Sequence, residues 1–314
     1  MNKFKKLGLT ALAGSLVAST AYAGEMSVAG SASIGIKNNS GTDGGKSITM
    51  GNQLTFSGGG ELDNGLNVAL SFVLDHGDNV ASGFDSHSIT VSSDTLGSIV
   101  VAGDGTGNAQ SALDTTAAGD AWDNGFTHGA AATAYVAMGG STASNNKSVN
   151  YTFPSVMDDL ALSASYSGTT TGIKSTTAWA ATYTGIEGLS VSYGSGENGT
   201  VGSEADLTTM KASYAMGSFT AAYSNTENDT SAGTDEEMTS FKISYTVTDD
   251  LSVSYGEESH ETSGESVDEE FEAISVSYTT GGMTLTAAQY DASGLANTAG
   301  NTAERWKLGA SFAF

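Results

Sequence analysis

Apolar and polar residues alternate along almost the whole chain beyond residue 25, which is the pattern of β-strands with one apolar face. The clearest example is the segment GLNVALSFVLD, in which Leu66, Val68, Leu70, Phe72 and Leu74 fall on one side. Helical periodicity is scarcely detectable in this part of the chain. The alternation predicts strands at about 26–37, 48–62, 65–75, 86–93, 97–104, 147–154, 158–168, 174–184, 187–195, 206–216, 218–225, 238–248, 250–258, 269–279, 282–292 and 303–314.

The connections between these strands alternate in length. Short turns such as LDNGL (Leu62–Leu66) and TTGGM (Thr279–Met283) contain the Asn-Gly and Gly-Gly pairs of β-hairpins. Between successive short turns lie longer loops rich in Gly, Ser, Asn and Asp. A transmembrane β-barrel has short periplasmic turns at one rim and long extracellular loops at the other, whereas a soluble sandwich has no reason to keep this alternation. The pattern therefore predicts an all-β, 16-stranded antiparallel transmembrane barrel.

Aromatic residues are sorted by strand direction, which supports a membrane barrel. Strands that leave a short turn carry an aromatic near the long-loop end, and the returning strands carry one near the short-turn end. The first set is Phe72, Tyr166, Tyr193, Tyr223, Tyr255 and Tyr290, and the second is Tyr151, Phe153, Tyr183, Tyr214, Tyr245, Tyr278, Phe312 and Phe314. Two aromatic girdles around an apolar band mark the two membrane interfaces. A barrel of this width cannot be filled by its side chains, so we expect an aqueous channel.

Residues 1–23 have the order of a bacterial secretory signal peptide. Lys3, Lys5 and Lys6 precede an apolar stretch that ends in Ala21-Tyr22-Ala23. We expect cleavage between Ala23 and Gly24, which leaves residues 24–314 as the barrel and directs it to the cell outer membrane.

The composition narrows the partners further. The formal net charge is −24, and there is no cysteine. Phosphate binding needs clustered lysine and arginine, so nucleic acid is excluded as a partner. An acidic surface suits the binding of cations or the repulsion of anions.

The alternation assigns six basic residues to the lumen wall. They lie opposite the apolar face of their strands and are Lys37, Lys174, Lys211, Lys242, Arg305 and Lys307. Charged side chains point to water, and here that water is in the lumen. A second interpretation is that these residues set ion selectivity.

The longest connection, about 104–146, is too long for a bare loop of a compact domain. It contains Trp122, Phe126 and Tyr135, which argue against disorder. A loop with apolar residues and no outer surface to cover is expected to fold against the inner wall and narrow the pore. Its carboxylates would then form a constriction opposite the basic wall, and the candidates are Asp104, Asp114, Asp120 and Asp123. The alternative is a solvated outer loop.

Two further acidic segments, Asn225–Met238 and Gly256–Glu272, contain no basic residue apart from His260. One interpretation is a solvated external face, with no cofactor bound. The other is a surface that binds Ca²⁺ together with the anionic headgroups of outer-membrane lipids and lipopolysaccharide, because hard cations prefer oxygen ligands. No EF-hand spacing is present, so the metal ligands stay unknown.

The chain resembles the general diffusion porins of alphaproteobacteria, the Rhodobacter-type members of the Gram-negative porin superfamily. The similar stretches are NQLTFSGGGELDNGLNVALSF (52–72), LGSIVVAGDGTGNA (96–109) and the terminal WKLGASFAF. The resemblance implies a homotrimer, a long third loop folded into the lumen, and passive diffusion of small hydrophilic solutes. Relatives often have an arginine-rich wall, whereas this chain has a single arginine, Arg305. We therefore expect a preference for cations.

Two other functions stay open on the sequence alone: a solute-selective outer-membrane channel, and a non-conducting structural or adhesive surface barrel. No catalytic arrangement such as G-x-S-x-G is present, so we expect no enzyme. The last strand, 303–314, must pair with the first to close the barrel. Its Phe312 and Phe314 lie at the periplasmic rim. The resemblance also implies that the terminal phenylalanine is a signal for the barrel assembly machinery.

Overall fold

The computed structural model describes residues 26–39, 45–75, 86–104, 108–113, 116–128, 148–169, 171–202, 204–231 and 235–314. The expected signal peptide, with Ala23 and Gly24, lies outside the described residues, as does Asp114. Among the described residues, no helix has the length and hydropathy that a membrane-spanning helix requires.

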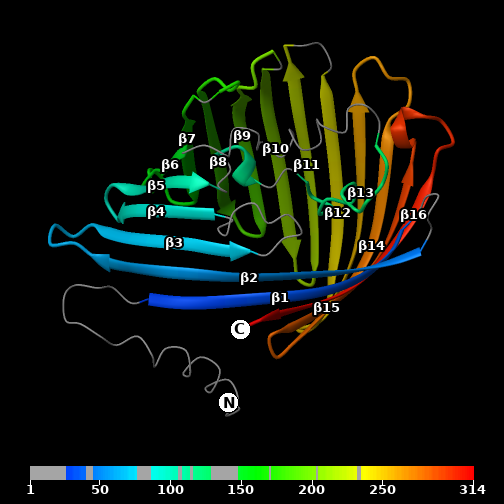
Figure 1. Ribbon diagram of the computed structural model, residues 1–314, viewed down its shortest axis with the longest axis horizontal. Helices are drawn as coiled ribbons and strands as arrows, with labels where there is room; N and C mark the ends of the chain where they lie inside the picture. The colour runs from blue at the N-terminus through cyan, green and yellow to red at the C-terminus, as the bar shows by residue number, and fades with distance from the viewer. Residues whose placement is uncertain are drawn as a thin grey trace.

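The described strands form one closed antiparallel barrel, in which each strand pairs with its sequence neighbours and β1 also pairs with β16 (Figure 1). This confirms the predicted fold class. The strands are β1 (Met26–Asn39), β2 (Gly45–Glu61), β3 (Asn67–Asp75), β4 (Ser86–Ser93), β5 (Gly97–Asp104), β6 (Ser148–Thr152), β7 (Leu160–Ser167), β8 (Thr176–Ile186), β9 (Leu189–Asn198), β10 (Ala205–Met216), β11 (Phe219–Thr230), β12 (Glu236–Thr248), β13 (Leu251–Thr262), β14 (Glu269–Thr280), β15 (Met283–Ser293) and β16 (Ala303–Ala313). Two single-turn 3-10 helices are η1 (Ser111–Leu113) and η2 (Leu295–Asn297).

Most large apolar residues of the strands point outward. Ile48 is 77% exposed and Met50 is 70% exposed on β2, although both are large and apolar. In water such a surface would be unfavourable, but in a bilayer it meets hydrocarbon. Closure of the sheet satisfies the backbone hydrogen bonds that lipid cannot satisfy. The outward apolar face therefore follows directly from the alternation in the sequence.

Most of the predicted girdle aromatics are exposed on the outside, including Tyr166, Tyr193, Tyr214 and Phe312. Tyr290 instead faces the same side as Arg305, with which it pairs in register, and its assignment to the girdle was wrong. It packs against an inner cluster that contains Phe271. On β15, Leu285 and every second residue from it point outward. Alternation places Tyr290 on the opposite face.

Several strands extend further toward the long loops than the sequence predicted. β11 continues to Thr230 and β13 to Thr262, whereas the predicted strands ended at about 225 and 258. The two acidic segments are therefore largely continuations of the sheet. Because side chains alternate along a strand, about half of their polar residues point inward, and Asn228, Glu258 and Glu269 are buried there.

Candidate pore constriction

Part of the long connection between β5 and β6 runs along the inside of the barrel. We call its described residues, 108–113 and 116–128, the constriction segment (Figure 1). The Ala109 N–H donates to Ser165 Oγ of β7 at 2.9 Å, and Gln110 Nε2 donates to Thr209 Oγ1 of β10 at 2.7 Å. The N–H groups of Ala117 and Ala118 donate to Ser240 Oγ of β12 at 3.0 and 2.7 Å.

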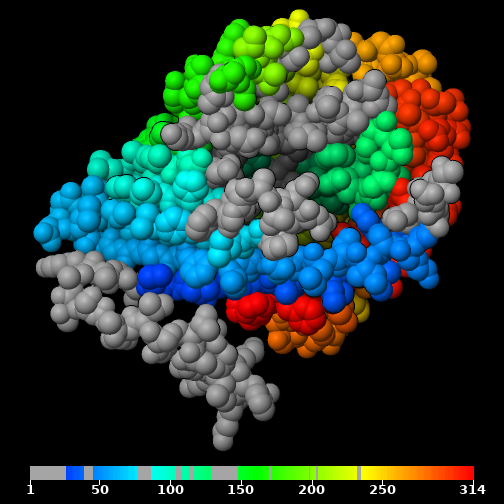
Figure 2. Space-filling model, in the orientation of Figure 1, coloured from blue at the N-terminus to red at the C-terminus, as the bar shows by residue number. Residues whose placement is uncertain are grey.

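These contacts show that the constriction segment crosses the inner wall strand by strand. Figure 2 shows a hollow in the middle of the molecule, beside the green surface of the segment's later residues. The predicted folding of the loop into the lumen is confirmed for the described part. Ser165 and Ser240 on the wall accept hydrogen bonds from backbone N–H groups of the segment, which need such partners when they are buried.

An apolar platform on the wall holds the later half of the segment. Phe126 and Phe271 of β14 have ring centroids 5.6 Å apart. The buried members of this cluster are Ala121, Phe126, Phe271, Ala273, Ala292 and Leu295. Burial of apolar surface from both sides stabilises the docked loop.

Glycine on the wall allows the backbone of the segment to come close. A Cβ atom at Gly256 of β13 would lie 2.8 Å from Ala118 Cβ and 3.1 Å from Ala118 Cα. A Cβ at Gly194 of β9 would lie 3.2 Å from Gln110 Cα. Real Cβ atoms rarely come this close to a backbone atom, so the absence of a side chain at these positions fixes how deep the segment lies.

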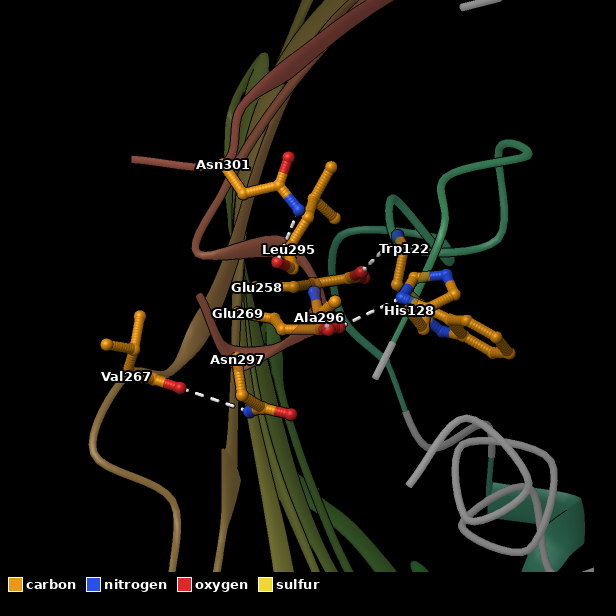
Figure 3. A network of polar contacts seen from close by, with 9 residues as sticks. All are labelled: Trp122, His128, Glu258, Val267, Glu269, Leu295, Ala296, Asn297 and Asn301. Atoms are coloured by element: carbon orange, nitrogen blue, oxygen red, sulfur yellow. Dashed lines mark hydrogen bonds and ion pairs between the residues drawn. The ribbon is translucent and has the colours of Figure 1, made fainter. Parts of the chain in front are cut away.

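Two buried carboxylates bind the segment to the wall (Figure 3). Glu258 Oε2 on β13 accepts the Trp122 N–H at 2.9 Å. Glu269 Oε2 on β14 lies 2.9 Å from His128 Nδ1. Both glutamates are almost completely buried. They hold residues 122 and 128, which lie on either side of Phe126.

Two of the predicted basic wall residues donate hydrogen bonds to this segment, and two more lie close to it. Arg305 of β16 donates through Nη2 to the Gly125 carbonyl and through Nη1 to the Asn38 carbonyl. Lys211 of β10 donates to the Thr116 carbonyl at 3.3 Å. The ammonium groups of Lys37 and Lys242 lie beside Gly125 and Gly119. Arg305 and Lys211 therefore support the backbone of the segment.

Of the other two predicted basic residues, one faces the lumen and one does not lie on a strand of the wall. Lys307 is exposed and pairs in register with Lys37 across β1 and β16, so it faces the same side. Lys174 lies before the start of β8, in the connection from β7, and its exposed ammonium forms an ion pair with Glu204. Its hydrogen bond lowers the pKa of the Glu204 carboxyl to about 2. Lys174 is therefore outside the strand part of the wall, and its charge is offset locally.

Asp120 and Asp123, two of the predicted acidic residues, are exposed on the segment. Asp120 Oδ1 accepts a hydrogen bond from Thr116 Oγ1 at 2.9 Å. Asp104 ends β5, and Asp114 lies outside the described residues. The sequence placed the acids and the bases on opposite sides of the pore. In the structure the segment packs onto the wall that bears the bases, because its apolar residues fit the platform there.

Glu258, Glu269 and His128 were not predicted as site residues. A signal for the two glutamates was present in the sequence. Glu258 is two residues from Gly256, and Glu269 is two residues from Phe271, so each lies on the same face of its strand as that neighbour. If the two strands had been extended to include them, alternation would have predicted that both glutamates point inward. In the part of the chain that the structure describes, no group of three or more His, Cys, Asp or Glu side chains is arranged to hold a metal ion.

Comparison with known proteins supports this geometry. The sequence profile of the Gram-negative porins matches residues 8–291. The chain belongs to this family. No curated protein sequence matches the chain.

Solved porin structures have the same fold. The anion-selective porin from Comamonas acidovorans superposes with a TM-score of 0.71 at 15% identity, covering 92% of this chain and 99% of that one. The trimer form of OmpT from Vibrio cholerae gives 0.68 at 16% identity, covering 93% and 100%. A mutant porin of Rhodobacter blastica gives 0.67 at 15% identity, covering 92% and 100%.

This porin is therefore an outer-membrane channel for passive diffusion. Family and fold point to a channel rather than an enzyme. Of the functions that the sequence left open, the water-filled pore narrowed by an inner loop agrees with the structure.

Proposed function

We propose that this porin prefers cations, because exposed carboxylates of the constriction segment dominate the field beside it. The supporting observation is that two bases are bound to the loop backbone, whereas two carboxylates of the loop are exposed. Arg305 and Lys211 donate to loop carbonyls, whereas Asp120 and Asp123 are exposed. A cation in the lumen meets these carboxylates before it meets Arg305 and Lys211 beneath the backbone, and the exposed Lys307 offsets them only in part. The strongly negative net charge of the chain adds attraction at the pore mouths.

The fold leaves selectivity open. The Comamonas acidovorans relative is described as anion-selective, although it shares this fold at 15% identity. Selectivity must therefore come from the side chains that each barrel places at its constriction.

Planar-bilayer recording of the refolded protein tests this function. With a tenfold KCl gradient, we expect stepwise currents and a reversal potential of the sign for K⁺. A reversal potential of the opposite sign, or at zero, contradicts the cation preference but leaves the channel. A refolded barrel that gives no steps would contradict the open pore itself.

We further propose a homotrimer, which would cover part of the outward apolar face of β1 and β2. Ile34, Ile48 and Met50 are exposed there. OmpT is described in a trimer form. Light scattering of the detergent-extracted protein, corrected for bound detergent, tests this: three chains support it and one chain contradicts it.

Phe314 and Phe312 are proposed as the signal that the barrel assembly machinery reads. Both are exposed at the end of β16. Replacement of both by alanine should reduce insertion into outer membranes while refolding in detergent is retained. Unchanged insertion contradicts the signal role.

A further inference from the structure

We propose that Glu269 is a positioning residue that couples the extracellular β15–β16 loop, residues 294–301, to the constriction segment. Channel conductance would then depend on the state of that outer loop. The inference rests on the channel activity and is independent of the proposed cation preference.

Glu269 joins the two loops through its two carboxylate oxygens. Oε2 lies 2.9 Å from His128 Nδ1 in the constriction segment, and Oε1 accepts the Ala296 N–H at 2.8 Å (Figure 3). The side chain is 1% exposed. A buried carboxylate needs hydrogen-bond donors, so displacement of either loop removes one of its donors at a cost in free energy. This makes the positions of the two loops interdependent.

The outer loop is held in one conformation. Ala296 and Asn297 have φ of 56° and 50°, a region that non-glycine residues rarely adopt. Such backbone persists only where its surroundings fix it. Here Asn301 Nδ2 donates to the Leu295 carbonyl at 2.7 Å, and Asn297 Nδ2 donates to the Val267 carbonyl at 3.0 Å. The Ala296 N–H is thus presented to Glu269 by a preformed turn.

The loop also contacts the platform through a side chain. Leu295 is buried in the same apolar cluster as Phe126 and Phe271. The cluster therefore contains residues of the outer loop, the wall and the constriction segment. An outward movement of the loop would remove one side of the packing around Phe126.

On the constriction segment, the ring of His128 packs against two other aromatic rings, so a shift of His128 should also move its neighbours. Its ring centroid lies 5.7 Å from that of Phe271 and 6.0 Å from that of Trp122. Trp122 is itself bound to Glu258 through its backbone. Loss of the Glu269 contact should therefore loosen residue 128 and disturb the rings of Trp122 and Phe271 that pack against it, although Glu258 still binds the Trp122 N–H.

The first experiment compares single-channel recordings of Glu269→Gln with those of Glu270→Gln. Glu270 is the next residue on β14 and is exposed, so it is a matched charge control. We expect Glu269→Gln to raise the fraction of time in alternative conductance levels at least about fivefold, the lower end of typical coupling effects. Glu270→Gln should leave the level distribution unchanged.

A second variant separates loss of the contact from a folding defect of β14, on which Glu269 lies. His128→Phe keeps an aromatic ring at the platform and removes the nitrogen that faces Glu269. Because residue 128 lies on the loop, the barrel should close normally in this variant. We expect the same additional conductance levels as in Glu269→Gln.

The third experiment tests coupling from outside. The chain contains no cysteine, and Ala299 is exposed on the outer loop, so Ala299→Cys can be labelled with biotin maleimide. Streptavidin added to the extracellular side should change the level distribution when Glu269 is present. In Ala299→Cys with Glu269→Gln it should change little.

An equal response to streptavidin in both backgrounds would indicate direct obstruction of the mouth and would overturn the coupling. Unaltered level distributions in both Glu269→Gln and His128→Phe would overturn the positioning role. In either case the unlabelled wild-type channel still reports whether the pore function holds.

Discussion

The backbone of Phe314 pairs with that of Gly30, and its ring lies in the space that a side chain at position 30 would occupy. The Gly30 N–H donates to the Phe314 carbonyl at 2.7 Å, and the Phe314 N–H donates to the Gly30 carbonyl at 2.9 Å. A Cβ atom at position 30 would lie 2.3 Å from Phe314 Cε2. The pairing of β1 with β16, which closes the barrel, therefore ends in a residue pair joined by two backbone hydrogen bonds.

Gly30→Ala should weaken this pairing. The phenyl ring must move to admit the methyl group, and because this ring is 72% exposed and can rotate, we expect a loss below the ~1–3 kcal/mol of overpacking in a closed core. Gly58→Ala is the control, because a Cβ there meets Met26 Cγ at an ordinary 3.5 Å. The unfolding midpoint in a heated-gel mobility assay should fall for Gly30→Ala and stay near wild type for Gly58→Ala. Equal midpoints would show that the ring relaxes without cost.

Asp120→Asn together with Asp123→Asn should lower the cation preference. In water, one carboxylate about 4 Å from a passing cation contributes about 1 kcal/mol, or roughly fivefold in local concentration. The reversal potential in a KCl gradient should move toward zero. Asp206→Asn with Asp229→Asn, on exposed positions of β10 and β11, is the charge-matched control. A shift as large in the control would place the selectivity outside the constriction.

Lys307→Gln and Arg305→Gln should differ, although each removes one positive charge. Lys307 is exposed, so its loss should raise the cation preference by up to about fivefold without altering the conductance levels. Arg305 supports the Gly125 carbonyl, so its loss should also produce additional conductance levels. Single-channel recordings give both quantities. Identical behaviour of the two variants would contradict a supporting role for Arg305.

Gly256→Val should push the constriction segment off the wall. The first added carbon already lies 3.1 Å from Ala118 Cα, and the valine branch adds to the clash. We expect a changed unitary conductance with a closed barrel, because the strand backbone is unaltered. Gly168→Val is the control, since a Cβ at Gly168 meets no atom within 4 Å. An unchanged conductance in Gly256→Val would show that the segment is positioned from its other contacts.

Prediction from the sequence succeeded where one residue and its strand neighbours decide the outcome. The alternation in GLNVALSFVLD fixes which residues face lipid, and the short turns fix the order of the strands. The prediction was wrong at Tyr290, which was assigned to the outer girdle because it is aromatic, although alternation from Leu285 places it on the inner face. It also ended β11 and β13 too early, because charged residues were interpreted as loops.

The constriction could be predicted only in part. The apolar residues Trp122 and Phe126 indicated that the loop must cover something. They did not indicate what, since the platform at Phe271 and Leu295 is assembled from strands and a loop far along the chain. The support from Lys211 and Arg305 was hidden for the same reason.

The sequence by itself determined the barrel, its lipid face and its closing strand, because period-2 alternation and turn length act between near neighbours. Only the tertiary structure decided where the loop rests, which bases lie beneath its backbone, and that Glu269 joins His128 to Ala296. Those relations depend on curvature and closure, which bring residues of β1, β10, β14 and β16 around one lumen.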